Sequence, residues 1–151
     1  MRVRFESADQ PDVIALIDAL DAYQMPLYPP ESHHGIDVRA LCRPEVRFAV
    51  VRDERAVAVA CGAVVLEGLQ GELKRMYVDP AFRGRGIGRV LMGFLEQAAV
   101  EHGCKRLLLE TGVRQPEAIA FYEACGFRHR GPFGDYTTDP HSVFLQKELG
   151  V

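Results

Sequence analysis

The sequence predicts one α+β domain over residues 1–151, a mixed α/β fold with a central mixed sheet. We expect six to seven strands, antiparallel in the first half of the sheet, and about four helices on its two faces. Three observations predict this fold. A length of 151 residues suits one domain with a real core. Short polar turns join the β-rich segments of the first half, which indicates antiparallel neighbours. A strand, a long amphipathic helix and a second strand then follow in order, which indicates a parallel pair.

The first elements are predicted from local patterns. Residues 2–6 alternate polar and apolar side chains, as a half-buried strand does. Asp9 suits the residue before a helix and Pro11 suits its first turn, so a helix is expected from there to about Tyr23. The prolines of residues 25–35 exclude a regular helix in that segment.

Three antiparallel strands are expected next, after a short helix over residues 37–41. Residues 45–51 and 56–66 are rich in apolar and β-branched side chains, and the polar residues 52–55 separate them as a hairpin turn. A glycine-containing turn leads to the third strand, over residues 72–78.

The second half begins with a long helix. From Ile87 the apolar residues recur at i, i+3, i+4 and i+7, which predicts a helix with one buried face, and Gly103 is a suitable end. The remaining elements are expected to be a strand over residues 105–110, a helix over 116–125, and strands over 127–130 and 143–147.

Composition narrows the class of protein. The net charge of −3 gives no general nucleic-acid footprint. The sequence starts without the apolar core of a signal peptide and has no apolar run near the ~20 residues that span a bilayer, so we expect a cytoplasmic protein without membrane contact. The four cysteines are scattered, and the pair His33–His34 has no third ligand at a suitable spacing, so neither a disulfide framework nor a metal site is expected.

A glycine loop precedes the long helix. Residues 83–88 place glycines at three alternate positions, which lets backbone N–H groups approach a ligand closely. These groups lie at the N-terminus of a helix, where free N–H groups and the positive end of the helix dipole favour an anion. Between residues 72 and 89 five basic side chains stand against two acidic ones. The loop therefore predicts a ligand that carries phosphate.

Two common phosphate motifs fit this loop poorly. A dinucleotide-binding G-x-G-x-x-G follows its strand directly, whereas here Arg89 replaces the third glycine and five residues come between strand and loop. A P-loop needs Lys followed by Ser or Thr after its last glycine, and no glycine here is followed by that pair.

Two motifs resemble a known family. Residues 83–88, Arg-Gly-Arg-Gly-Ile-Gly, resemble the [Q/R]-x-x-G-x-[G/A] signature of the GCN5-related N-acetyltransferases (GNAT). Residues 115–127 are similar to the N-x-x-A-x-x-F-Y-x-x-x-G-F stretch of that family. The resemblance covers about the last two thirds of the chain. It implies a GNAT-like fold and transfer of an acetyl group from acetyl-CoA, as co-substrate, to a primary amine.

The resemblance also implies which residues bind acetyl-CoA. In the family the loop grips the pyrophosphate and main-chain groups of the preceding strand hold the pantetheine and the carbonyl. Gln115 stands where the family usually has Asn, so the same amide would act from a longer arm. The residues implied for acetyl-CoA are Met76, Tyr77, Val78, Arg83, Gly84, Arg85, Gly86, Ile87, Gly88, Arg89, Gln115 and Tyr122.

Two catalytic roles follow from the same resemblance. Tyr122 is the candidate general acid by its place in the second motif, since a phenol with a pKa near ~10 suits protonation of a departing thiolate. The structural alternative for Tyr122 is a packing aromatic at the helix–sheet boundary. Glu72 is the first candidate for the general base and Glu110 the second, with water as a third. A salt bridge to Lys74 is the structural alternative for Glu72.

The acceptor is predicted to be a small amine such as an amino acid. Candidate contacts in the proline-rich segment are Tyr28, Ser32, His33 and His34, and Arg75 would pair a carboxylate. Each of these residues also suits a solvated loop or an ordinary surface position. Polyamines, aminoglycosides and the lysine side chains of proteins stay open as acceptors, as does an acyl group longer than acetyl.

A protein with a different class of function could carry the same glycine loop. A non-catalytic module that binds acetyl-CoA for regulation would share every binding residue, and only the enzyme would release CoA when an amine is present. A homodimer through the last strands is also left open.

Overall fold

A computed structural model describes residues 1–150, in which seven strands form one mixed sheet with the order β1-β2-β3-β4-β5-β7-β6. Neighbouring strands are antiparallel except β4 and β5, which are parallel. The predicted fold class, antiparallel first half included, is confirmed. The strands are β1 (Arg2–Phe5), β2 (Val46–Arg52), β3 (Ala58–Glu67), β4 (Gln70–Val78), β5 (Arg106–Gly112), β6 (Arg128–Arg130) and β7 (Ser142–Glu148).

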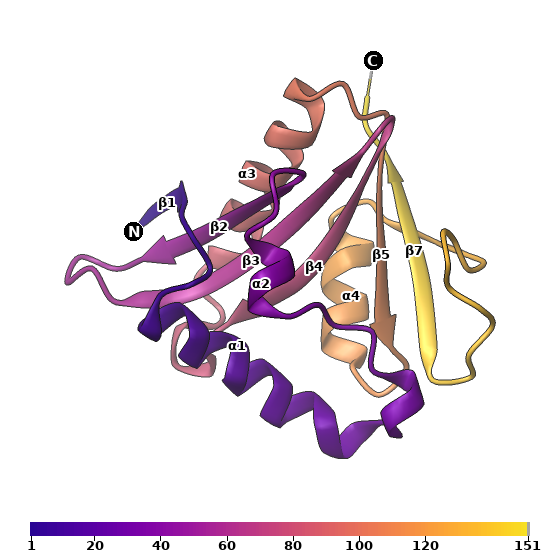
Figure 1. Ribbon diagram of the computed structural model, residues 1–151, viewed down its shortest axis with the longest axis horizontal. Coiled ribbons are helices and arrows are strands. Elements are labelled where there is room, and N and C mark those ends of the chain that lie inside the picture. The colour runs from indigo at the N-terminus through magenta and orange to yellow at the C-terminus, as the bar shows by residue number, and fades with distance from the viewer. Residues whose placement is uncertain (151) are drawn as a thin grey trace.

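Helices cover both faces of the sheet. Helices α1 and α2 lie on one face and α3 and α4 on the other, as Figure 1 shows. The proline-rich segment forms two short 3₁₀ turns rather than a regular helix, as predicted from its prolines. The helical elements are α1 (Pro11–Gln24), α2 (Val38–Leu41), α3 (Ile87–Glu101), α4 (Pro116–Ala124), η1 (Met25–Leu27), η2 (Pro30–Ser32) and η3 (Pro80–Phe82).

The start of α1 differs from the prediction by one residue. Gln10, not Asp9, precedes the helix, and its side chain makes no cap hydrogen bond to the first turn. The Asp9 N–H is bonded to the Ser7 hydroxyl at 3.1 Å, so Asp9 belongs to the turn before the helix. Pro11 occupies the first helical position, where its missing N–H is not needed.

Helix α3 contributes its buried face to the largest of the three apolar clusters. Leu91, Leu95 and Ala99 are fully buried against the sheet, which is what the helical spacing of apolar residues requires. Val90 belongs to the same predicted stripe but is 55% exposed, because it lies at the edge of the buried face. Gly103 follows the helix with φ of +89°, a left-handed conformation that glycine adopts at little cost.

The sheet opens in its middle, between β4 and β5. These strands pair only from Gln70 and Arg106 to Glu72 and Leu108. Beyond that point they diverge, and α4 lies behind the opening (Figure 1). Along its other edge β4 carries a bulge opposite β3, where Arg75 has φ of +57°. Beyond Glu72 and Leu108 the two strands are therefore not paired with each other, the bulge interrupts the ladder between β3 and β4, and the cavities described below lie at this opening.

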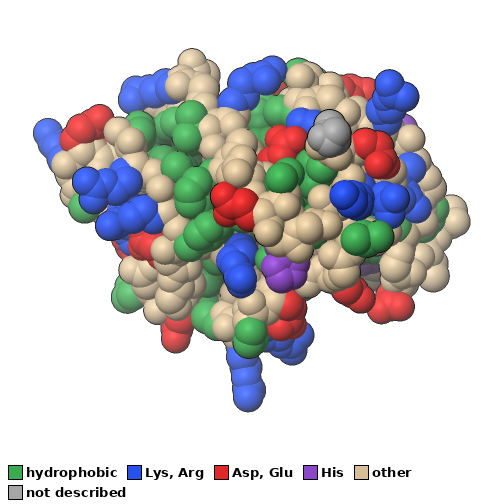
Figure 2. All heavy atoms as spheres, turned by 90° about the horizontal axis from the view of Figure 1, so that it is seen from above, with side chains coloured by type: hydrophobic (Ala, Val, Ile, Leu, Met, Phe, Trp, Pro, Cys, Tyr) green, Lys and Arg blue, Asp and Glu red, His purple; other side chains and the backbone are tan. Residues whose placement is uncertain are grey.

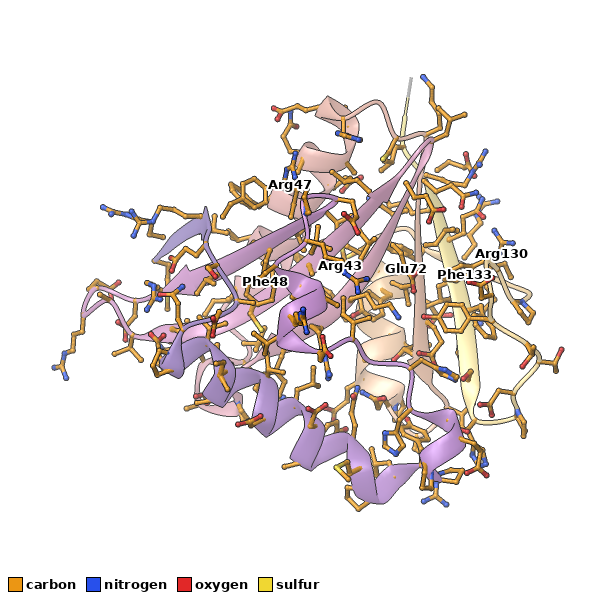
Figure 3. The ribbon with its side chains drawn as sticks, in the orientation of Figure 1. Arg43, Arg47, Phe48, Glu72, Arg130 and Phe133 are labelled. Carbon is orange, nitrogen blue, oxygen red and sulfur yellow. The ribbon has the colours of Figure 1, made fainter. Side chains whose placement is uncertain are left out.

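A third, smaller apolar cluster lies on β5 and β7. Leu108 and Phe144 of the strands pack against Phe133 and Tyr136, which come from the segment between β6 and β7. Figure 3 shows Phe133 beside β7. This cluster fixes the segment over the sheet, so residues 131–141 reach the open middle of the sheet.

The surface carries charges of both signs. On the face that Figure 2 shows, Lys and Arg side chains alternate with Asp and Glu side chains. Among residues 1–150, no helix combines the length and the apolar character that crossing a membrane requires.

Candidate active site

Two cavities meet at the opening between β4 and β5. The first, about 380 Å³, is bordered by the glycine loop and is named here the glycine-loop cavity. The second, about 480 Å³, contains His33, His34 and His141 in its wall and is named the histidine cavity. Five residues line both cavities and form the wall between them: Leu20, Met76, Gln115, Ala118 and Tyr122.

The glycine loop presents free backbone N–H groups. Gly84 and Gly86 have φ of +79° and +78°, and a Cβ at either position would meet no atom within 4 Å, so this side of the loop is open. In the described part of the chain, the amides from Gly84 to Arg89 have no backbone acceptor, and Val90 is the first residue that bonds back, to the Gly86 carbonyl at 3.2 Å. The N-terminus of α3 is therefore an array of unpaired donors, suited to an anion.

Two of the three loop arginines border the glycine-loop cavity. Arg83 lines it, donates from Nε to the Val78 carbonyl at 3.0 Å and lies over the Tyr77 ring. Arg89 also lines it. Arg85 does not: its guanidinium lies over the Phe82 ring at 5.1 Å. The other residues implied for acetyl-CoA all border this cavity.

Tyr122 lies in the wall between the cavities. Only 8% of the residue is exposed, and burial raises the pKa of its phenol well above the usual value of 10. Among residues 1–150, His34 Nε2 is the one fully buried side-chain polar atom without a hydrogen-bond partner. The Tyr122 hydroxyl has no protein partner and is absent from that class, so it keeps contact with the cavity space.

Glu72 borders the histidine cavity but is already engaged. Its Oε2 accepts a hydrogen bond of 2.6 Å from the Tyr136 hydroxyl and lies 3.3 Å from Lys74 Nζ. Lys74 Nζ also donates to the Tyr136 hydroxyl at 2.6 Å and to the His34 carbonyl at 2.8 Å. Figure 3 shows Glu72 at the place where β4 and β5 begin to diverge. The salt bridge to Lys74 is thus present.

Glu110 borders the same cavity with fewer partners. It lies two residues beyond Leu108, the partner of Glu72 in the parallel register, so both carboxylates are on one face of the sheet. Ser142 Oγ donates to Glu110 Oε2 at 2.8 Å. Burial raises the pKa of Glu110 above its usual value of 4.5, while Ser142, His34 and Lys74 act in the opposite direction.

The structure brings the predicted acceptor residues together. Tyr28, Ser32, His33, His34 and Arg75 all line the histidine cavity. The guanidinium of Arg75, however, binds Asp21 Oδ1 at 2.5 Å and the Ile36 carbonyl at 3.0 Å. Since Lys74 is also paired, neither cation of this cavity is free to meet a carboxylate.

Several residues of this region were not found from the sequence, and three of them contact the site directly. His141 and Thr111 line the histidine cavity, and Tyr136 holds Glu72 and Lys74. His141 and Tyr136 come from the segment between β6 and β7, which carries neither a periodic pattern nor a recognisable motif. Thr111 follows Glu110 in β5, and its position could have been inferred from the strand.

Gln115 connects the two sides of the site. Only 8% of the residue is exposed, and its Oε1 accepts a hydrogen bond of 3.0 Å from the Tyr28 hydroxyl. Tyr28 belongs to the proline-rich segment, so this bond ties the histidine cavity to the start of α4.

Comparison with known proteins shows which family the chain matches. Residues 16–127 match the model of the family described as Acetyltransferase (GNAT) family. An IAA acetyltransferase of Azospirillum brasilense is 48% identical over 146 residues, which are 95% of this chain and 95% of that protein.

Solved structures agree with this match. A Klebsiella pneumoniae structure described as an acyl-CoA N-acyltransferase has a TM-score of 0.84 and 37% identity, over 99% of this chain and 97% of that one. An aminoglycoside 6′-N-acetyltransferase complexed with coenzyme A has a TM-score of 0.75 and 18% identity, over 100% and 98% of the two chains, and shows the likeness of fold.

Proposed function

The chain belongs to the GNAT family of acetyltransferases and is an acetyltransferase, and on this premise we propose that it moves an acetyl group from acetyl-CoA to the primary amine of a small molecule. The observation that carries the proposal is the meeting of two cavities at Tyr122 and Gln115. One cavity offers an anion site and the other offers a carboxylate with a raised pKa.

The residues of the glycine-loop cavity fit acetyl-CoA. Unpaired amides from Gly84 to Arg89 suit the diphosphate, and the guanidinium groups of Arg83 and Arg89 add positive charge beside it. Met76, Tyr77 and Val78 border the same cavity, and their main-chain groups would hold the pantetheine arm, with Gln115 in the wall shared by the two cavities. Acetyl-CoA supplies an activated thioester.

Tyr122 is proposed as the general acid. The residue lines both cavities, its hydroxyl has no protein partner among residues 1–150, and the phenol is protonated throughout the neutral range, so a proton is available for the departing sulfur.

Glu110 is proposed as the general base ahead of Glu72. A base must be free to take the amine proton, and Glu72 is held by Tyr136 and Lys74 whereas Glu110 has one hydrogen-bond donor, Ser142. Burial also brings the pKa of Glu110 closer to neutrality, where a base works best. Glu72 is the second candidate, because it lines the same cavity.

The acceptor is proposed to be a small amine recognised mainly by hydrogen bonds. The histidine cavity of about 480 Å³ suits a small molecule. Its two cations, Lys74 and Arg75, are paired within the chain, so a carboxylate on the acceptor would find imidazole and hydroxyl groups rather than a free guanidinium. An amino acid and its decarboxylated amine are therefore the pair of compounds to compare.

A thiol-release assay tests this function. The chain is incubated with acetyl-CoA and, in turn, with amino acids, their decarboxylated amines, polyamines and lysine peptides, and free CoA thiol is measured. We expect release above the amine-free rate with at least one small amine. The rate should be unchanged in Gly93→Ala, since a Cβ at Gly93 meets no atom within 4 Å. Binding of acetyl-CoA without amine-dependent thiol release over the panel would contradict the proposal.

A further inference from the structure

Tyr28 lies unusually close to the backbone of β5. A Cβ built on Gly112 would stand 1.7 Å from the Tyr28 hydroxyl oxygen and 2.0 Å from its Cζ. Gly112 does not have a positive φ, so the absence of a side chain there is needed for space and not for backbone conformation. Gly112, the last residue of β5, thus leaves room for the ring of Tyr28, which lies 84 positions earlier in the sequence.

The hydrogen bonds of Tyr28 have a defined direction. Its hydroxyl oxygen accepts from the Arg114 N–H at 3.2 Å, and its proton is donated to Gln115 Oε1 at 3.0 Å. A third contact, 3.0 Å between His33 Nε2 and the Tyr28 carbonyl, holds the backbone of the same residue. The side-chain oxygen of Gln115 is thereby fixed, and its NH₂ group is left with both hydrogens unused within the chain.

The Gln115 amide nitrogen keeps access to the cavities. It has no protein partner among residues 1–150, yet His34 Nε2 is the one fully buried polar side-chain atom there without a partner, so the Gln115 nitrogen is not sealed off. Gln115 lines both cavities. The Gln115 NH₂ group, whose amide oxygen is held by Tyr28, therefore faces the place where acetyl-CoA and the amine would meet.

We propose that Tyr28 is a positioning residue that directs the Gln115 amide toward the acyl donor. The missing side chain at Gly112 leaves the room that the Tyr28 ring needs for this contact. The inference rests on the proposed function. It links the acceptor segment, residues 25–34, to the wall of the acetyl-CoA site, so that the donor side is complete only when that segment is in place. It also explains the glutamine: its longer arm reaches Tyr28 while the amide remains between the two cavities.

A double-mutant cycle tests the link. Tyr28→Phe keeps the ring on Gly112 and removes the hydroxyl, and kcat/KM for acetyl-CoA should fall about tenfold, the effect of one lost hydrogen bond. Gln115→Ala should cost at least as much. In the Gln115→Ala background, Tyr28→Phe should have almost no further effect, because Tyr28 acts through Gln115. Independent, additive losses would overturn the proposal, and Gln97→Ala, an exposed glutamine on α3, is the control.

Gly112→Ala gives a second test that leaves both partners intact. The added methyl group must displace the Tyr28 ring, so kcat/KM for acetyl-CoA should fall at least as far as in Tyr28→Phe. Gly93→Ala on α3, where a Cβ meets no atom within 4 Å, should leave it unchanged. Thermal unfolding of each variant separates a folded, misaligned site from loss of the fold. Wild-type kinetics in a folded Gly112→Ala protein would contradict the assigned role of Gly112.

Failure of this inference differs from failure of the proposed function. If the wild-type chain releases no CoA with any amine, the proposed function fails and the positioning role fails with it. If the wild type is active and the cycle is additive, only the link between Tyr28 and Gln115 is wrong.

Discussion

Tyr122 lies in the wall between the two cavities and Glu110 borders the histidine cavity, and burial raises the pKa values of both side chains. For Tyr122, removing the hydroxyl tests a role in proton transfer. Tyr122→Phe should lower kcat by about a hundredfold, the usual contribution of a general acid, and leave the Kd for acetyl-CoA nearly unchanged. Steady-state kinetics and calorimetry give the two values. An unchanged kcat would show that Tyr122 serves only packing.

Glu110 should set the pH dependence of the rate. Because its pKa is raised above 4.5, the carboxylate that accepts a proton is lost as the pH falls through that higher value. We expect the acidic limb of the wild-type pH–rate profile above pH 4.5. It should vanish in Glu110→Gln, whose rate should be about a hundredfold lower. Glu72→Gln should keep the limb; the reverse result would restore Glu72 as the base.

Glu110→Gln should also change the stability of the fold. Glu110 binds its proton more tightly in the folded chain than in the unfolded chain. The contribution of the protonated carboxyl group to the free energy of unfolding is therefore present below the unfolded pKa and is lost as the pH rises through the raised folded pKa. A neutral glutamine avoids this loss and can still accept from Ser142. In denaturant unfolding, the free energy of unfolding of Glu110→Gln minus that of the wild type should therefore be larger at pH 7 than at pH 4.

At the scale of elements, the glycine loop and α3 act as one unit. Gly86 precedes the helix in the left-handed region, with φ of +78°. A side chain there costs about 1–2 kcal/mol and adds a methyl group beside the free amides. Gly86→Ala should weaken acetyl-CoA binding about tenfold in calorimetry and lower stability, whereas Gly93→Ala in the same helix should do neither. Equal affinities in the two variants would contradict the role of the loop.

The elements that were predicted correctly have a strong local signal. Helix α3 shows a period of 3.6 residues, the turns of the first hairpins are polar, and Pro116 and Gly126 bracket α4. The GNAT-like motifs placed the loop and Tyr122 beside one cavity. The bulge at Arg75 and the packing of residues 131–141 were not predicted, because they depend on contacts between segments far apart in the chain. The residues that were missed at the histidine cavity, His141 and Tyr136, belong to this unpatterned segment.

At the scale of the molecule, one charged network joins the N-terminal elements. Arg52 at the end of β2 binds Glu6 Oε1 at 2.9 Å, Asp12 Oδ2 at 2.6 Å and the Ala56 carbonyl at 2.8 Å. It therefore connects the residue after β1, the start of α1 and the hairpin between β2 and β3. Hydrogen bonds from Arg52 are the main reason that the pKa values of Glu6 and Asp12 are lowered.

This network predicts a pH-dependent loss of stability. Carboxylates with lowered pKa values stabilise the fold above their unfolded values of 4.5 and 3.8, and the gain is lost as the pH falls through the folded values. Arg52→Met should lower the free energy of unfolding by about 1 kcal/mol at pH 7 and by much less at pH 2. Urea unfolding at both pH values measures the difference. An equal loss at both would show that the charges do not contribute.

The proposed reaction requires acetyl-CoA to lie in the opening between β4 and β5. The most direct measurement is the change in amide chemical shifts when acetyl-CoA is added to isotope-labelled protein. We predict the largest changes at the backbone amides from Gly84 to Arg89 and at the side-chain amide of Gln115, with little change along β1 and the first turns of α1. Saturable changes elsewhere, with the amides of the glycine loop unmoved, would show that acetyl-CoA does not bind at the N-terminus of α3.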